Sequence, residues 1–385
     1  MTKPIRVVVA DDSPFVCRLL TSYLQSSSDF QVVGTALNGS RAVELVKELH
    51  PDTVTLDLEM PEMNGLEALE HIMYDCPTPV VLVSGVSRRA AAITLQALDM
   101  GAVDFILKYT PGVDTDPAAL RQEIIAKVRA ASQIKVIRSL RPRRQDRETV
   151  PALRQAAVVS LSNHQDTAPP PAYPSEGTGQ VSIPADVGER TQRRDISPFL
   201  PGGVVVIGAS TGGPVALREL LSNLPADFTA AIIVVQHMPA TFTGVLAAQL
   251  NRQVPLTVKE AETGDRLQPG LVLIAPGGYH LLLRPDSRVE LNQGPEIGGH
   301  RPSVDVTMQS VAQFYGARAK GVVLTGMGND GSLGLVSIRS KGGKTFAQDA
   351  ASCVVNGMPQ RAIEKGVVDH VAPPAQIAQL LRMTR

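Results

Sequence analysis

The stretch Val204-Val205-Val206-Ile207-Gly208-Ala209-Ser210-Thr211-Gly212-Gly213-Pro214 decides the fold of the second half of this chain. Its β-branched run predicts a buried strand, and the glycine-rich turn that follows leads into a helical pattern. The same alternation continues toward the C-terminus. It predicts strands at residues 203–207, 231–235, 271–275, 321–324 and 344–347, with helices at 215–221, 242–250, 304–314, 333–339 and 374–382. Such alternation favours a mostly parallel, doubly wound α/β domain of the Rossmann-like kind.

The first half of the chain shows a second alternation of this type. Five β-α repeats predict a flavodoxin-like α/β domain, with a parallel sheet covered by helices on both faces. The predicted strands are residues 6–10, 31–36, 53–56, 80–84 and 104–107, and the predicted helices are residues 14–25, 41–49, 66–74, 90–100 and 118–137.

Between these halves the periodicity disappears. A cluster of arginines near residue 140 is followed by sequence rich in Ala, Pro, Ser and Gln, in which we expect one short helix within residues 152–161 at most. Little in this composition offsets the entropy cost of an ordered backbone, so it predicts a flexible linker. The expected domains are therefore residues 1–138 and 200–385, joined by a linker at 139–199.

Composition narrows the function classes. Lys+Arg and Asp+Glu both number 37, and this balance gives no indication of nucleic acid or an anionic membrane as a partner. Cys17, Cys76 and Cys353 lie far apart without a CxxC pair, which argues against a disulfide framework or a zinc site and is typical of a reducing cytoplasm. We expect no signal peptide and no membrane insertion, because no apolar run approaches the roughly 20 residues of a membrane span.

Polar residues stand at the ends of several predicted strands in the first half. Asp11 and Asp12 end the first strand, Asp57 follows the third, Ser84 ends the fourth and Lys108 follows the fifth. Carboxyl ends of parallel strands share one sheet edge, where three carboxylates would repel one another without a hard cation such as Mg²⁺. Asp57 would then accept a phosphoryl group, with the Lys108 charge and the Ser84 hydroxyl as support.

Each of these aspartates alone would more often be a turn former or a helix cap. Their combination with Ser84 and Lys108 resembles the response-regulator receiver family. The resemblance covers about residues 5–134, and its motifs are Asp11-Asp12-Ser13, Leu56-Asp57-Leu58-Glu59-Met60-Pro61, Gly65-Leu66 and Lys108. Tyr109 stands where that family usually has proline.

The glycine-rich turn of the second half fits two chemistries. Glycines before a helix N-terminus can bind phosphate, and Gly208-x-Ser210-x-Gly212 also has the spacing of a nucleophile elbow. A dinucleotide-binding site usually has an acidic residue about 20 residues after the glycines, but this chain has Gln236-His237 at that position. His237 and Asp330 each follow a predicted strand, so a Ser210/His237/Asp330 triad is the favoured interpretation. The loop at residues 326–331 would supply N–H groups to an oxyanion.

Several separate motifs in this half resemble the CheB family of chemotaxis protein-glutamate methylesterases and glutamine deamidases. The match covers about residues 202–381 and includes residues 208–213, 236–239, 275–277, 300–305 and 324–331. The resemblance implies a glutamate methyl ester on a methyl-accepting chemoreceptor as substrate, and a chemotaxis histidine kinase as phosphodonor. It also implies that the unphosphorylated receiver covers the active site. No cofactor is expected for the ester reaction, and Thr211 and Met327 are the candidates for oxyanion or substrate contacts.

Two other classes of protein remain open at this point. The glycine-rich loop is compatible with a nucleotide-binding oxidoreductase, which the missing acidic residue disfavours. A response regulator with a non-enzymatic output domain is the other alternative, and the complete triad disfavours it.

Overall fold

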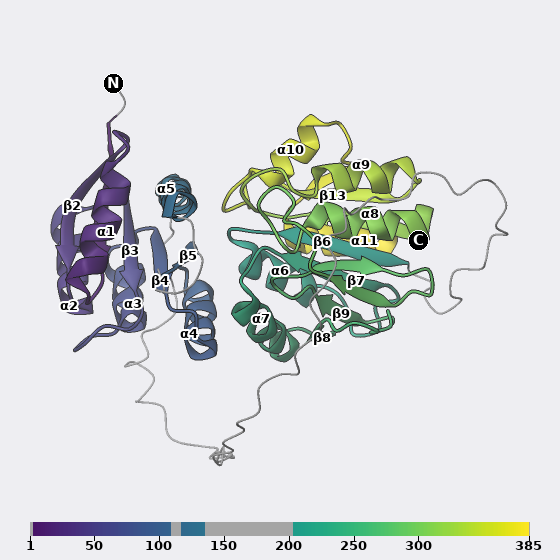
Figure 1. Ribbon diagram of the computed structural model, residues 1–385, viewed down its shortest axis with the longest axis horizontal. Coiled ribbons are helices and arrows are strands. Elements are labelled where there is room, and N and C mark those ends of the chain that lie inside the picture. Colours follow the sequence, from purple (N-terminus) through teal and green to yellow (C-terminus); the bar gives the residue numbers. More distant parts are fainter. Residues whose placement is uncertain (1–2, 109–116, 135–202, 385) are drawn as a thin grey trace, which may run out of the picture. The chain divides into compact units, whose positions relative to one another are not determined.

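A computed structural model describes residues 3–108, 117–134 and 203–384 and contains two α/β domains (Figure 1). The predicted linker at 139–199, the short helix expected within 152–161 and Tyr109 lie outside the described residues. In the described ranges, no helix is both long and apolar enough to cross a membrane.

The N-terminal domain is a five-stranded parallel sheet with helices on both faces. The strand order is β2-β1-β3-β4-β5, which carries the chain from a central strand first to one edge and then to the other. The strands are β1 (Ile5–Ala10), β2 (Phe30–Ala36), β3 (Thr53–Asp57), β4 (Val80–Ser84) and β5 (Asp104–Leu107). The helices are α1 (Pro14–Gln25), α2 (Gly39–Leu49), α3 (Gly65–Asp75), α4 (Arg88–Asp99) and α5 (Pro117–Ser132).

Alternation along the strands divides the core of this domain in two. Val7 and Val9 of β1 face α1 and α5, whereas Val8 and Ala10 face the side that α2, α3 and α4 cover. The helices begin where a polar side chain can cap them; for example, Ser13 accepts from Val16 N at the start of α1. The predicted helix at 118–137 was too long, because α5 ends at Ser132. The backbone N–H groups of Gln133 and Ile134 each donate to the carbonyl three residues earlier, which ends the helix.

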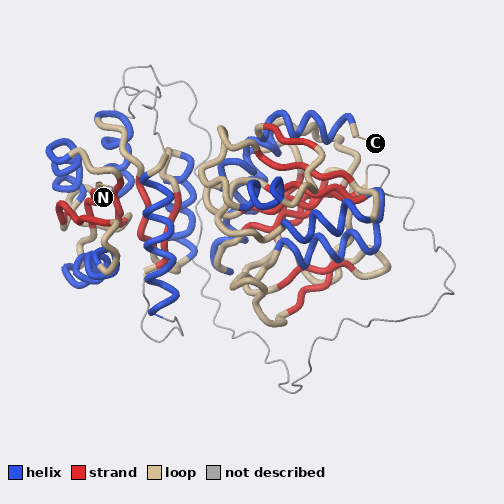
Figure 2. The backbone as a smooth tube through the Cα atoms, turned by 90° about the horizontal axis from the view of Figure 1, so that it is seen from above, coloured by secondary structure: helices blue, strands red, loops and turns tan. Residues whose placement is uncertain are grey.

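The C-terminal domain is a seven-stranded parallel sheet in the order β14-β13-β12-β6-β7-β9-β8, plus a separate β10-β11 hairpin. Figure 2 shows helices on both sides of the strands. Apolar side chains of α6, α7 and α11 cover one face of the sheet, and those of α8, α9 and α10 cover the other. The strands are β6 (Val204–Ala209), β7 (Ala231–Gln236), β8 (Thr257–Glu260), β9 (Leu271–Ile274), β10 (His280–Leu283), β11 (Val289–Asn292), β12 (Ala319–Val323), β13 (Lys344–Gln348) and β14 (His370–Ala372). The helices are α6 (Gly213–Ser222), α7 (Ala240–Gln253), α8 (Val304–Tyr315), α9 (Ser332–Ser340), α10 (Met358–Glu364) and α11 (Pro374–Met383), with a 3₁₀ turn at Gly316–Arg318.

The predicted alternation is confirmed, but several short elements were not foreseen. These are β8 and β14 at the two sheet edges, the β10-β11 hairpin and the seven-residue α10. Each is three to seven residues long, and the edge strands are partly polar, so none carries a strong periodic signal.

The centre of this sheet determines where a site can form. From β6 the chain moves outward to β7, and later it returns to β12 on the opposite side of β6. Strand order therefore reverses between β6 and β12. Ligands of such sheets bind outside the carboxyl ends of the strands at that point. The loops that leave β6, β7 and β12 there contain Ser210, His237 and Asp330.

Candidate active site and acidic site

Ser210 lies in a tight turn between β6 and α6. Its backbone N–H donates to the carbonyl of Thr325 at 3.0 Å, and its own carbonyl accepts from Gly213 N at 2.8 Å and from Gln236 Nε2 at 2.9 Å. Gly212 has a φ of 76°, a left-handed conformation that glycine adopts without steric cost. The turn is thus fixed from both neighbouring strands, and it presents Ser210 just beyond the sheet.

The loop after β12 approaches this turn closely. A Cβ added to Gly326 would lie 2.8 Å from Ser210 Cβ and 2.3 Å from Met358 Sδ. Gly326 itself is held by hydrogen bonds to Val355 O and from the N–H groups of Gly357 and Met358. The absence of a side chain at Gly326 therefore lets this loop pass beside Ser210.

His237 follows β7 directly, and the register of the sheet places it next to Ser210. Ala209 of β6 pairs with Gln236 of β7, so the residues that follow each of them leave the sheet side by side. His237 Nε2 lies 2.8 Å from Asp330 Oδ2, and its Nδ1 is buried without a hydrogen-bond partner in the described part of the chain. With Asp330 ionised, Nε2 carries the proton and Nδ1 keeps a lone pair, so Nδ1 is the basic atom.

Asp330 is a buried carboxylate surrounded by donors. Besides His237, it accepts from Val304 N at 2.7 Å, Asp305 N at 2.9 Å and Ser303 Oγ at 3.0 Å. These groups form the N-terminus of α8, where the helix dipole favours negative charge. Burial alone would raise the pKa of Asp330, but the hydrogen bond and positive charge of His237 and the backbone donors lower it to about 2. The Asp330 carboxylate is therefore ionised at neutral pH.

The segment before α8 contains contacts that sequence reasoning missed. The Ser303 hydroxyl reaches Asp330, and the His300 ring stacks on His237. Asp305 accepts from Gly334 N at 2.7 Å at the start of α9. Burial raises the pKa of the Asp305 carboxyl to about 6, and the nearby Asp330 adds to the rise. Ser303 has the sequence signature of an N-cap, but nothing in that signature indicates which carboxylate its hydroxyl reaches.

The two predicted oxyanion residues lie in the loops that flank Ser210. Thr211 is in the elbow turn, where its carbonyl accepts from Thr325 Oγ1 at 2.9 Å. Met327 follows Gly326, and its Cα lies 3.2 Å from a Cβ built on Gly357. The backbone N–H groups of Thr211 and Met327 have no hydrogen-bond partner among the described residues.

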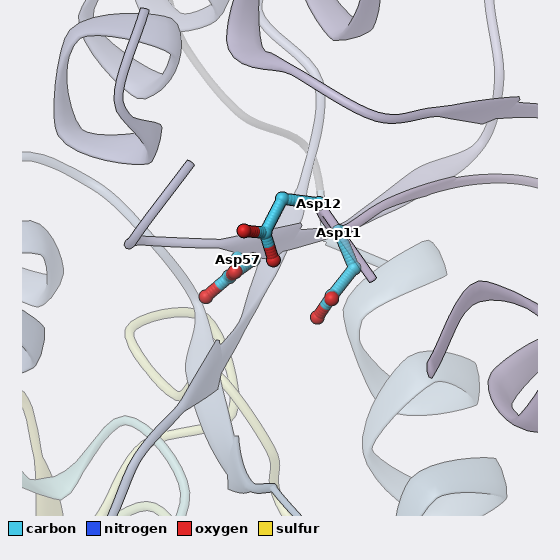
Figure 3. A group of neighbouring side chains, drawn as sticks. All are labelled: Asp11, Asp12 and Asp57. Atoms are coloured by element: carbon cyan, nitrogen blue, oxygen red, sulfur yellow. The ribbon is translucent and has the colours of Figure 1, made fainter. Parts of the chain in front are cut away.

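The acidic residues of the N-terminal domain also come together. Figure 3 shows the carboxylates of Asp11, Asp12 and Asp57, which offer oxygens that all lie within 4.8 Å of one another. Asp11 and Asp57 are buried, whereas Asp12 is exposed. Lys108 Nζ lies 2.7 Å from Asp57 Oδ2 and 3.0 Å from Asp11 Oδ2. Three carboxylates face one ammonium group, which leaves an excess of negative charge.

The pKa of Asp57 is displaced upward, mainly by burial. Burial raises the pKa of Asp57 to about 6, Lys108 opposes the rise, and Asp11 adds to it. The carboxylate accepts one backbone hydrogen bond, from Glu59 N at 3.2 Å. Ser84 ends β4 as predicted, but its hydroxyl lies 2.7 Å from Thr94 Oγ1 of α4. To contact a group on Asp57, this hydroxyl would have to leave Thr94.

Comparison with known proteins identifies the family of each domain. Residues 205–381 match the model of the CheB methylesterase family, and residues 7–122 match that of the response regulator receiver domain. A protein-glutamate methylesterase/protein-glutamine glutaminase of Symbiobacterium thermophilum is 42% identical over 379 residues, which cover 98% of this chain and 96% of the relative. A protein of the same name from Moorella thermoacetica is 41% identical over 415 residues, which cover 98% of this chain and 97% of the relative.

Among solved structures, the catalytic domain of Thermotoga maritima CheB methylesterase is 45% identical. The alignment covers 47% of this chain and 98% of that domain, with a TM-score of 0.46. The response regulator domain of the same protein is 43% identical and covers 34% of this chain and 99% of that domain, with a TM-score of 0.32. Given the near full-length relatives, this chain belongs to the CheB methylesterase family, as a response-regulator receiver domain followed by a CheB methylesterase domain.

Proposed function

We propose that this protein is a phosphorylation-activated serine esterase that hydrolyses glutamate methyl esters on chemoreceptors. The observation that carries the proposal is the His237–Asp330 pair. Nε2 contacts the Asp330 carboxylate, and Nδ1 is buried at the strand end next to Ser210 without a hydrogen-bond partner among the described residues. A histidine held in this way is a general base for a hydroxyl nucleophile.

In the acylation step, His237 Nδ1 takes the proton of the Ser210 hydroxyl while its oxygen attacks the ester carbonyl carbon. The tetrahedral intermediate collapses, the C–O bond to the methoxy group breaks, and the imidazolium gives its proton to the departing methoxy oxygen, which leaves as methanol. Asp330 holds the tautomer and stabilises the imidazolium that forms. Water then attacks the acyl-enzyme by the reverse sequence and releases a glutamate carboxylate.

The same acyl-enzyme forms from a glutamine amide, with ammonia as the leaving group. Deamidation therefore requires no additional residue, and we assign both reactions to Ser210, His237 and Asp330. Thr211 and Met327 are proposed to supply the oxyanion donors, and their backbone N–H groups, which have no partner within the described ranges, support this role. No cofactor takes part in the proposed ester reaction.

The receiver domain is proposed to be the switch. Asp11, Asp12 and Asp57 fit a divalent cation because their oxygens converge and their charge exceeds that of Lys108. Mg²⁺ suits such oxygen ligands and, when bound, neutralises charge on an incoming phosphoryl group. The Asp57 oxygen then attacks phosphorus, and the phosphodonor, a chemotaxis histidine kinase or a small phosphate ester or anhydride, keeps the electron pair of the broken bond.

Tethering connects the switch to the esterase. A receiver joined covalently to a catalytic domain has a high effective concentration at its surface, so weak coverage of the active site is enough for inhibition. Deleting residues 1–140 is expected to raise the basal rate of ester hydrolysis, and a fall in that rate would contradict inhibition by the receiver. We further place the enzyme in the cytoplasm, a proposal with which three unpaired cysteines agree.

The assignment of the nucleophile is tested with a serine-directed fluorophosphonate. The wild-type chain should be labelled at Ser210, and Ser210→Ala should lose both labelling and methanol release at an unchanged melting temperature. Ser337→Ala is the matched control, because this half-buried hydroxyl on α9 has one hydrogen-bond partner in the described part of the chain, the Leu333 carbonyl of its own helix. Methanol release by Ser210→Ala at the wild-type rate would show that another group is the nucleophile.

A further inference from the structure

The base of the proposed triad is in contact with a second imidazole. The rings of His237 and His300 are stacked, with centroids 3.9 Å apart and planes inclined by only 15°. His237 follows β7, whereas His300 comes from the segment ahead of α8, so the contact joins two separate parts of the domain. Such a face-to-face arrangement is specific to aromatic side chains.

The backbone holds His300 firmly in this position. His300 and Ile297 exchange two hydrogen bonds, each 3.1 Å long, which close a small loop. Next to it, the Arg301 guanidinium donates to Gly294 O at 2.8 Å and to Gln293 O at 3.2 Å. Two residues later, Ser303 and the start of α8 bind Asp330. One short segment therefore contacts both the histidine and the aspartate of the triad.

The face of the His300 ring, and not its nitrogens, makes the contact. Within the described ranges, neither ring nitrogen of His300 has a hydrogen-bond partner. Burial lowers the pKa of His300 to about 4, and the charge of His237 adds to the lowering. Within the catalytic domain, the titratable groups that act on it are His237 and Asp330. At neutral pH the His300 ring is therefore uncharged, and we call its stacked face the platform of His237.

Hydrogen bonding alone does not fix the plane of the His237 ring. Among the described residues its ring makes one hydrogen bond, from Nε2 to Asp330, and a turn of the ring about that bond would carry Nδ1 away from Ser210. Contact across the ring face removes this freedom. An uncharged π-face also tolerates the positive charge that His237 gains during the reaction, which a second cation would oppose.

We propose that His300 is a positioning residue of the esterase, whose ring face fixes the plane of His237 so that Nδ1 points at Ser210. This inference rests on the proposed serine-esterase function and adds a fourth side chain to it. His300 touches neither the substrate nor the reacting atoms in this account; it acts only through His237.

The test compares two substitutions of similar size in the full-length protein, His300→Phe and His300→Leu. Phe keeps a neutral ring face without nitrogens, and Leu keeps an apolar side chain without a ring. The values of kcat and KM for methanol release and the rate of fluorophosphonate labelling of Ser210 are measured together with Tm. We expect Phe to remain within about 2-fold of wild type, and Leu to lose about 3- to 10-fold in kcat and in labelling rate at unchanged KM and Tm.

Two results would overturn the proposal. If Phe loses as much kcat as Leu while both remain folded, a ring nitrogen of His300 is needed and the platform is not its role. If Leu keeps the wild-type kcat, the stack contributes nothing. Ser210→Ala, measured in parallel, separates this from failure of the proposed function: turnover by that variant would refute the triad itself, whatever the two His300 variants show.

Discussion

Asp57 and Asp330 are both buried aspartates at the carboxyl ends of parallel strands, yet their pKa values are shifted in opposite directions. The pKa of Asp57 is about 6 and that of Asp330 about 2. Asp330 accepts hydrogen bonds from a helix N-terminus, a hydroxyl and an imidazole. Asp57 has Lys108 and one backbone donor, and it shares its surroundings with two other carboxylates.

Burial raises the pKa of both carboxyls, and the difference shows that the supply of hydrogen-bond donors decides whether that rise is overcome. Asp330 accepts hydrogen bonds from several donors, so it remains ionised at neutral pH, as its role in the proposed triad requires. The acidic site is short of positive charge and acquires it only when a cation binds. The surroundings of Asp330 suit a carboxylate that must stay charged, and those of Asp57 suit a site that is occupied at some times and empty at others.

The largest effect is expected from removing the charge of Asp330. In Asp330→Asn the amide can donate to His237 Nε2, which moves the ring proton to Nδ1 and blocks the base. By analogy with tautomer-reversing changes in other triads, kcat should fall by about 10⁴-fold with KM little changed. Methanol release measures this, with the exposed Asp286→Asn as control. A loss below tenfold would mean that Asp330 does not set the tautomer.

The next effect concerns the response of the enzyme to phosphorylation. Asp57→Asn removes the nucleophilic carboxylate while keeping its size, so stimulation of methanol release by a small phosphodonor and Mg²⁺ should disappear. Asp12→Asn removes a cation ligand from the exposed side of the site and should weaken the stimulation without abolishing the nucleophile. Stimulation that persists in Asp57→Asn would place the phosphorylated residue elsewhere.

A third prediction follows from the raised pKa of Asp57. Mg²⁺ must displace the proton that this carboxyl holds below about pH 6, so the apparent Kd for Mg²⁺ should rise about tenfold for each pH unit below 6 and level off above pH 7. Calorimetric titration of the full-length protein at pH 5, 6 and 7 measures the change and the proton release. An affinity that does not vary with pH would contradict the assignment of Asp57 as a ligand.

The smallest effect is on stability without Mg²⁺. A folded-state pKa above the unfolded value favours the protonated form, so the contribution of Asp57 to stability falls as pH rises from about 4 to 6. Asp57→Asn should therefore gain stability relative to wild type between pH 5 and pH 7, by about 1–2 kcal/mol at one pKa unit per 1.36 kcal/mol.

Asp330 should behave in the opposite way. Its lowered pKa means that its contribution is present above about pH 4 and is lost as pH falls toward 2. Urea unfolding of the wild type, Asp57→Asn and Asp330→Asn across this range compares the two sites directly. A gain for Asp330→Asn on raising the pH would reverse the sign that the hydrogen bonds around Asp330 require.

The sequence predicted both α/β domains and the residues that gather at their strand ends, because strand ends can be located from hydrophobic runs alone. Residues 300–305 stood among the matching motifs, but the sequence could not show that His300 contacts His237 or that Ser303 contacts Asp330, because the path of this loop depends on tertiary contacts. Nor could it show which ring nitrogen of His237 contacts Asp330, since that depends on the side from which α8 presents Asp330.

The sequence also failed to predict the exact ends of some helices and the short strands at the sheet edges. The helix expected to run to residue 137 ends at Ser132, although apolar residues continue beyond it. The Thr257–Glu260 and His370–Ala372 strands are recognisable only from the neighbour with which each pairs. Neither limit affected the sites, because the site residues follow the long central strands.

The most direct test of the account is methanol release from a methylated chemoreceptor preparation, measured with and without Mg²⁺ and a small phosphodonor. The account predicts release that the phosphodonor increases in the wild type, no increase in Asp57→Asn, and no release from Ser210→Ala under either condition. Release that is the same with and without the phosphodonor, in a wild type shown to be phosphorylated at Asp57, would contradict the claim that the receiver controls the esterase.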